Sequence, residues 1–377
     1  MRYLSRFRKI AKNWSRPSPA GACANVNEKG KLLTNVLIEI AGSVSERMKR
    51  YVVRRLLSLV PVLLGITFLS FALMRLAGSD AITEMYSGVG AAVSQETLDA
   101  ARAKLGLDRP FLVQYLSWLG GMMTGDMGVS FVSGRNVSDT FLSKLPATLL
   151  LAALSVLLTV AVSLPLGVLS AVAHQKARTA RDAGLRFGCS LLDFVVRLGS
   201  FIGNSTPNFF VALLLMHFLA IRLGWLPVIS SGVTLAGAVM PTLTLAIAMS
   251  AKYLRQVRAA VLDELSKDYV TGAKARGVAE SVILTKSVLR SSLMTIVTLL
   301  ALSVGSLLGG TAIVETIFMW DGVGKLAVDA IMMRDYPLIQ AYVVWMAMIY
   351  VGVNLVADLL YLILDPRVRL EVERHDG

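Results

Sequence analysis

Apolar residues in this chain gather in long blocks, and most of the charges lie in the polar segments between them. A block of about 20 residues forms a helix long enough to cross the hydrocarbon core of a bilayer, because a helix rises about 1.5 Å per residue. The pattern predicts about six transmembrane helices in an all-α integral membrane protein. We expect these spans at 55–76, 147–173, 195–221, 236–251, 292–314 and 338–364.

Positive charge is divided unequally between the polar segments. The N-terminus, residues 174–190, residues 252–290 and the C-terminus are rich in Lys and Arg, whereas the alternate segments are acidic or neutral. Cytoplasmic segments of membrane proteins carry such an excess of basic residues. The charge pattern therefore predicts an N-in, C-in topology for a protein that crosses the membrane several times.

The composition excludes several classes of protein. The net charge of +13 would suit a nucleic-acid-binding protein, but the basic residues lie at the ends of apolar blocks, so we expect no nucleic-acid partner. Cys23 and Cys189 form no CxxC pair, and the three histidines have no metal-ligand spacing. Residues 322–325 lack the pattern of a phosphate-binding loop. We expect neither an enzyme nor a chain with its own cofactor or metal.

Polar residues inside the apolar blocks are the first candidates for function. His217 lies in the predicted third span, and Asn354 and Asp358 lie in the last. For His217 a hydrogen bond between helices and a place in a permeation path both stay open, and the position of Asp358 favours a structural pair. Arg255, with Arg258, follows the fourth span, where both are expected to anchor to lipid headgroups. A proton-coupled pump needs several carboxylates at mid-depth, so energy for transport must come from elsewhere.

The basic segment 263–290 is too long for a simple connection between two spans. Asp268 and Tyr269 can begin a helix, Gly277 ends it, and a second amphipathic helix is predicted at about 279–290. Two short helices at a sharp turn are suited to docking into the groove of a partner. An amphipathic linker lying on the membrane surface is the alternative.

Several stretches resemble the permeases of ABC importers. In their coupling loop, Glu-Ala-Ala is followed by three residues and Gly; here residues 271–273 read Thr-Gly-Ala before Gly277. The chain is most similar to the first permease of dipeptide, oligopeptide and nickel systems. That similarity lies in KRYVVRRLL (49–57), LGLDRPFLVQYLSWL (105–119), GDMGVSFVSGRNV (125–137), LPAT (145–148), STPNFF (205–210), LGWLP (223–227), residues 309–340 and DPRVR (365–369). Departures such as Asp321 in place of the usual Pro affect loop geometry.

The resemblance implies a type I ABC importer permease fold, a multi-pass location in the bacterial inner (plasma) membrane, and a set of partners. These are a second, homologous permease in a heterodimer, two ABC ATPase subunits that bind ATP and Mg²⁺, an extracytoplasmic substrate-binding protein, and membrane lipid. The substrates of the family are peptides, glutathione-like peptides, and nickel or metal-opine chelates. Segments 205–227 and 263–270 look closer to the nickel and opine branch.

The resemblance also proposes roles for individual residues. Asp268, Tyr269, Ala273, Arg276 and Gly277 would form the loop that couples the permease to the ATPases. Two further pairs complete the candidates: Asn208 and His217 for the translocation path, and Glu315 and Asp321 for contact with the binding protein.

The same resemblance divides the chain into three parts. Residues 1–47 form a basic, cytoplasmic extension with partial order, unless translation begins at Met48. Residues 48–145 hold the first span and an extracytoplasmic segment, and residues 146–370 form the core that contains 263–290. A secondary transporter or channel independent of ATP, and a membrane-embedded sensor or scaffold, are the rival functions.

Overall fold

The computed structural model describes residues 57–76, 108–229 and 232–364, together with a few single positions before them. The predicted extension 1–47, most of the polar segment 77–107 and the C-terminal residues 365–377 lie outside the described residues. The chain divides into two units, Met1–Val60 and Pro61–Gly377, and the account below concerns the second.

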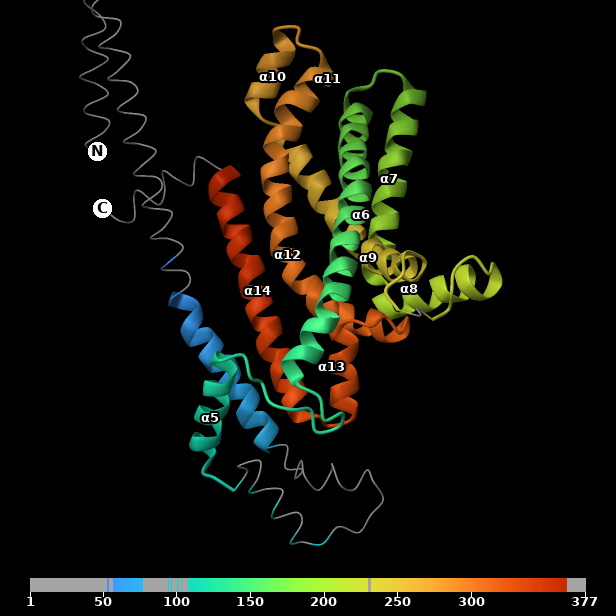
Figure 1. The fold of residues 1–377 in the computed structure, drawn as a ribbon. Coiled ribbons are helices and arrows are strands. Elements are labelled where there is room, and N and C mark those ends of the chain that lie inside the picture. The colour runs from blue at the N-terminus through green and yellow to red at the C-terminus, as the bar shows by residue number, and fades with distance from the viewer. Residues whose placement is uncertain are drawn as a thin grey trace, which may run out of the picture. The chain divides into compact units, whose positions relative to one another are not determined.

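The described part of the chain is almost entirely helical. The helix Leu57–Leu76 comes first and is followed by a series of labelled elements (Figure 1). These are α5 (Phe111–Met123), α6 (Val137–Thr179), α7 (Ala183–Ser205), α8 (Asn208–Leu215), the π-helical η1 (Met216–Arg222), α9 (Leu235–Leu265), α10 (Asp268–Ala275), α11 (Glu280–Val282), the π-helical η2 (Ile283–Val288), α12 (Leu289–Ile317), α13 (Val323–Met332) and α14 (Tyr336–Leu364).

Side chains at the first turns explain where the long helices begin. Asn136 accepts a hydrogen bond from the backbone N–H of Asp139 at 3.2 Å at the start of α6. Asp182 caps α7 through the N–H groups of two following residues, and Thr234 caps α9. Such caps satisfy backbone donors that have no partner inside the helix.

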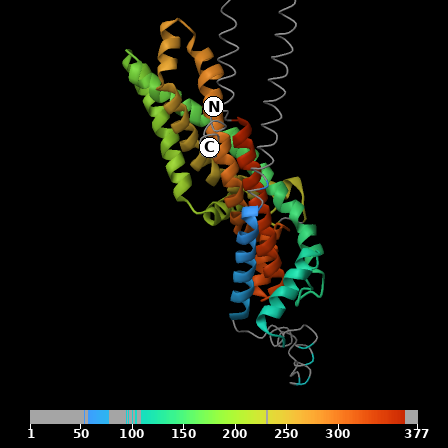
Figure 2. The same cartoon turned by 90° about the vertical axis from the view of Figure 1, so that its left-hand side faces the viewer.

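The two groups of polar segments lie at opposite ends of the second unit. The turn between α6 and α7 and the turn between α10 and α11 are at one end, and α5 and α13 are at the other (Figures 1 and 2). α6 has 43 residues, so at about 1.5 Å per residue it is about 65 Å long and exceeds a bilayer core. The separation agrees with the charge pattern, which assigns 174–190 and 252–290 to the same side.

The predicted third span, 195–221, is wrong as one straight helix. α7 begins at Ala183 and ends at Ser205, and the following pair α8 and η1 departs from its direction by 102°. Pro207 explains the break, because proline has no N–H to donate and disfavours helical geometry in the residue before it. Thr206 is accordingly extended, with φ −89° and ψ 125°.

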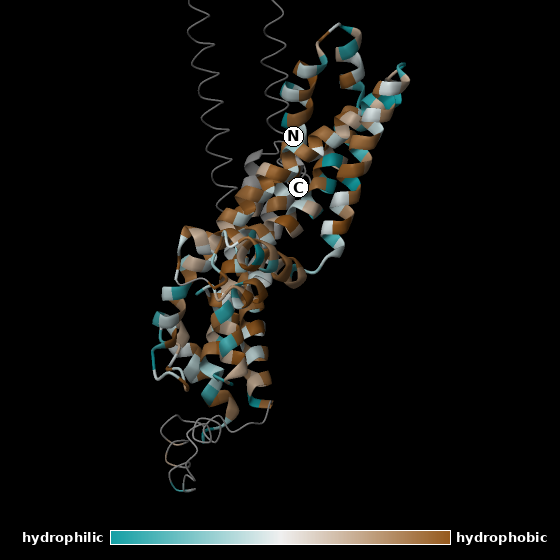
Figure 3. Ribbon diagram, turned by 90° about the vertical axis from the view of Figure 1, so that its right-hand side faces the viewer, coloured by the Kyte–Doolittle hydropathy of each residue, from teal (hydrophilic) through white to brown (hydrophobic). Residues whose placement is uncertain are grey.

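The other spans form helices near their predicted places. Among the described residues, four helices are long and apolar enough to cross a membrane, and the bent pair would make a fifth. α12 occupies the predicted fifth span with 29 residues. Hydrophobic residues predominate along the long helices, and hydrophilic residues are more frequent near their ends (Figure 3).

α9 is the central helix, packed along α6, α7 and α12. Gly167 of α6 permits the close approach of α6 and α9. A Cβ added there would lie 2.6 Å from Val257 Cγ1 and 3.1 Å from the carbonyl oxygen of Leu254. Small residues at such positions let helices in a membrane pack through their backbones.

We expect Gly167→Ala to lower the thermal stability of the purified protein, because overpacking costs about 1–3 kcal/mol. Gly188→Ala on α7 is the matched control, since a Cβ at Gly188 would meet no atom within 4 Å. Thermal unfolding in a membrane mimic measures both. Equal melting temperatures for the two variants would contradict this account of the α6–α9 contact.

Candidate functional site

A sharp turn joins α10 to α11, and we call residues 268–280 the elbow. Gly277 has φ +78°, a left-handed conformation that favours glycine. Its N–H donates to the carbonyl of Lys274 at 3.0 Å, and the N–H of Val278 donates to that of Ala273 at 3.2 Å. This pair of bonds closes the helix end in a Schellman motif. A Cβ at Gly277 would meet no atom within 4 Å, so glycine is favoured here by backbone geometry alone.

Aliphatic side chains anchor the inner side of the elbow. Val270 of α10 is 1% exposed and packs in one cluster with Ile283 and Val288 of η2 and with Val257 and Val261 of α9. Ala273 is partly buried against the same cluster. The inner side of the elbow is therefore packed into the same hydrophobic cluster as α9.

The outer side of the elbow is polar and exposed. Asp268, Tyr269 and Arg276 are all exposed. The hydroxyl of Tyr269 donates to Glu264 Oε2 at 2.9 Å. Partial desolvation of the hydroxyl, together with this bond and the charge of the Glu264 carboxylate, raises the pKa of the phenol above its ordinary value. Lys274 and Glu280 form an ion pair at 3.4 Å across the turn. All five predicted coupling residues lie in the elbow: Asp268, Tyr269, Arg276 and Gly277 are exposed, whereas Ala273 is on the inner side.

The second half of the predicted helix pair differs from the expectation. Instead of a separate helix at about 279–290, the chain continues from α11 through η2 into α12, which ends at Ile317. Val282, Ile283, Val288 and Leu289, at the junctions, all have right-handed helical geometry, so no break separates the segments. The elbow thus leads directly into a long helix.

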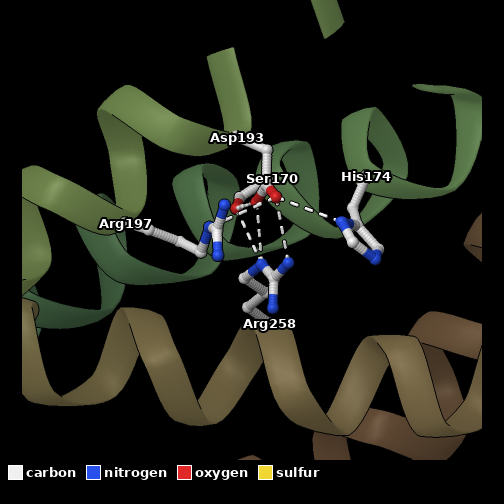
Figure 4. A network of polar contacts seen from close by, with 5 residues as sticks. All are labelled: Ser170, His174, Asp193, Arg197 and Arg258. Atoms are coloured by element: carbon white, nitrogen blue, oxygen red, sulfur yellow. Dashed lines mark hydrogen bonds and ion pairs between the residues drawn. The ribbon is translucent and has the colours of Figure 1, made fainter. Parts of the chain in front are cut away.

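A buried carboxylate joins α6, α7 and α9 (Figure 4). The Asp193 side chain is 3% exposed, and Arg258 donates to it through Nε at 2.8 Å and Nη2 at 3.0 Å. Ser170 Oγ donates at 2.6 Å, His174 Nδ1 lies 3.2 Å away, and Arg197 Nε lies 3.3 Å away. Bidentate Arg–carboxylate pairs are among the strongest polar contacts in proteins.

This network was not predicted. Our third span began at residue 195, which left Asp193 outside it, and Arg258 was expected to anchor to lipid headgroups. The structure corrects the second point, because Arg258 faces Asp193 and its side chain is only 17% exposed. The available signal was the spacing of Asp193 and Arg197, four residues apart in an apolar run, which places both on one helix face.

Glu315 is fully buried, which corrects its predicted contact with a binding protein. Thr148 Oγ1 donates to Glu315 Oε1 at 2.7 Å, and the N–H of Lys325 donates to Oε2 at 2.9 Å. The carboxylate thus lies at the N-terminus of α13, where a helix favours negative charge. A Cβ on Gly322 or Gly324 would approach Oε2 to 2.5 or 2.8 Å, so both glycines make room for it. Glu315 joins α6, α12 and α13.

Asp321 and the two path candidates lie elsewhere. Asp321 is on the surface, 55% exposed, and forms an ion pair with Lys144. Asn208 begins α8, and His217 lies in η1, exposed, with its ring edge-to-face to that of Phe218 at 5.3 Å. Both path candidates therefore belong to the segment after the 102° bend, and their predicted role in translocation stays a prediction.

Long apolar helices, with a helical elbow packed against them at one end, define a helical membrane protein that crosses the bilayer several times. The family comparison agrees: the model described as "Binding-protein-dependent transport system inner membrane component" matches residues 183–370. The N-terminal model of the same family matches residues 48–152. The chain belongs to this family of importer permeases.

Similar proteins support the assignment along nearly the whole chain. The oligopeptide transport system permease protein AppB of Bacillus subtilis is 39% identical over 333 residues, covering 85% of this chain and 99% of that protein. The glutathione transport system permease protein GsiC of Salmonella typhimurium is 34% identical, covering 85% and 99%. A chain of the inward-facing MetNI methionine ABC transporter has the same fold, with a TM-score of 0.50 at 17% identity, covering 60% of this chain and 96% of that one.

These findings confirm the predicted type I importer permease fold. The chain is a transmembrane permease subunit of an ABC importer in the bacterial inner membrane, and it is not an enzyme. Permeases of this family work with ATPase and substrate-binding partners.

We expect Asp193→Leu to destabilise the protein by about 3–5 kcal/mol, because it leaves Arg258 and Arg197 without their carboxylate. The double variant Asp193→Leu/Arg258→Leu removes the bidentate pair as a unit and should recover much of the loss. Thermal unfolding of the single and double variants measures the effect. A double variant as unstable as the sum of the two single variants would contradict a paired role.

Proposed function

We propose that this chain forms part of the translocation pathway for peptides in an ATP-driven importer. The names of AppB and GsiC, which refer to oligopeptides and glutathione, support this substrate class. The nickel and metal-opine alternative rests on the sequence likeness of 205–227 and 263–270. No similar protein reported above has a name that refers to nickel, so that alternative stays a prediction.

The elbow is the proposed docking site for an ABC ATPase subunit. The observation that carries this proposal is its two-sided construction: an exposed polar tip, and an inner side buried against α9. A partner that moves the tip must also move α9 and α12. ATP and Mg²⁺ would bind to two such ATPase subunits, and this chain would hold no cofactor of its own.

The remaining partners follow from the same proposal. The elbow end would face the cytoplasm, which agrees with the basic residues at the α6–α7 turn and with an N-in, C-in topology of six spans. The opposite end, with exposed Asp321, would receive the substrate-binding protein. A second, homologous permease would complete the pathway as a heterodimer, with Asn208 and His217 as candidates to line it.

A bulky residue at Gly277 tests the docking role. A left-handed backbone costs most L-residues about 1–2 kcal/mol, and asparagine tolerates it better. We expect Gly277→Val to reduce ATP-dependent peptide uptake by at least about tenfold, since about 1.4 kcal/mol corresponds to a factor of ten. Uptake into proteoliposomes that contain the full transporter and its binding protein measures the effect.

Gly277→Asn is the matched control and should retain most of the uptake. Both variants should reach the membrane in normal amounts, because a Cβ at this position meets no atom within 4 Å. Co-purification of the ATPases should fall for the valine variant only. Full uptake by Gly277→Val would exclude the docking role. Uptake by this chain without any ATPase would favour the secondary transporter or channel instead.

A further inference from the structure

The polar network of α6, α7 and α9 carries more positive than negative charge. Asp193 is the carboxylate in ion-pair contact with both Arg197 and Arg258, and within the described residues no second carboxylate forms an ion pair with either arginine. His174 adds a further nitrogen at 3.2 Å. One carboxylate thus faces two permanent positive charges, and the network lacks one anion.

The two arginines differ in how many of their N–H groups contact Asp193. Arg258 is 17% exposed and donates to Asp193 through both Nε and Nη2. Arg197 is 52% exposed, and its contact with Asp193 runs through Nε at 3.3 Å. A guanidinium has five N–H donors in a planar fork, so most donors of Arg197 lie outside this contact. Figure 4 shows Arg197 at the opposite side of the carboxylate from His174.

The position of Arg197 makes this excess charge significant. α7 runs from Ala183 to Ser205, so Asp193 and Arg197 lie near its middle. Charged side chains inside a membrane face a partner or a water-filled cavity and seldom face lipid. Arg197 therefore requires a further anion or water beside α7.

A cavity begins one turn further along the same helix. It has a volume of about 270 Å³ and lies between α6, α7 and α9, with Gly199, Ser200 and Gly203 on one wall and Ser250 on another. A Cβ on Gly199 would meet no atom within 4 Å, so this wall is open. The cavity offers little charge of its own, and Arg197 lies in the helix turn before it.

We propose that Arg197 binds the carboxylate of the transported solute as it passes along α7. This rests on the proposed function as a peptide importer. Every unmodified peptide ends in a carboxylate, which supplies the anion that the network lacks. A guanidinium fork matches a carboxylate in two parallel hydrogen bonds, whereas an ammonium provides a single point charge. Arg258 holds Asp193, and Asp193 orients Arg197.

The test uses the full transporter in proteoliposomes with its binding protein, supplied with trialanine and with trialanine amide. Arg197→Gln should lower trialanine uptake at least tenfold and abolish any preference for the free acid over the amide. Arg197→Lys should keep that preference with uptake within about threefold of wild type. Because the binding protein is the same in each reaction, a change in preference arises at position 197.

Arg186→Gln is the control, since Arg186 is an exposed arginine on the same helix outside the network. It should transport both probes as the wild type does. Normal co-purification of partner subunits with Arg197→Gln would complete the support for the proposal.

Two results would overturn it. Loss of partner subunits from Arg197→Gln would mean that Arg197 pairs with another protein chain or serves assembly. An unchanged preference for the free acid in that variant would mean that Arg197 does not bind the carboxylate of the solute. Failure of the wild-type transporter to import either probe with ATP would instead count against the peptide-import function itself.

Discussion

Buried aliphatic contacts between the elbow and α9 limit what the rest of the chain can do. Val270 on α10 and Val288 on η2 meet Val257 and Val261 of α9 in a cluster whose members are almost fully buried. Protein interiors are packed as densely as organic crystals, so such a cluster does not shear without loss of contact energy. A force on the elbow therefore reaches α9 and α12 as a displacement of whole helices.

The charged network extends this rigid body to α7. Arg258 is the residue after Val257, so the bidentate bond to Asp193 begins next to the aliphatic cluster. Buried ion pairs add little net stability, yet breaking one is costly because it leaves a charge without a partner. The pair therefore fixes how α7 lies against α9 more than it stabilises the fold. In the proposed mechanism the Arg258–Asp193 pair would make Arg197 move together with the elbow.

Periodicity and charge predicted the helices and the grouping of their ends, because both follow from local composition. The glycine at 277 was also readable, since few residues adopt a left-handed helix end. Met319 and Arg334, with φ 53° and 54°, end their helices in the same left-handed conformation. The sequence did not reveal these two helix ends, because neither residue type favours that conformation. Nor could the sequence reveal that Asp193 meets Arg258, 65 residues away, or that Glu315 is buried. Those facts depend on packing between helices, which local patterns do not encode.

The helix α12 is tightly packed at both ends, which limits how it can move. At one end α12 begins in the elbow cluster, and at the other the buried carboxylate of Glu315 joins it to α6 and α13. Both ends resist sliding, so a transport cycle must bend the chain where its helical bonds are interrupted. The extended backbone at Thr206 and Pro207 is such a place, and the π-helical η1 is another. A coupling energy of about 1–3 kcal/mol between sites is typical of allosteric proteins. Energy of that size would deform the chain at these interruptions, because the packed ends resist deformation.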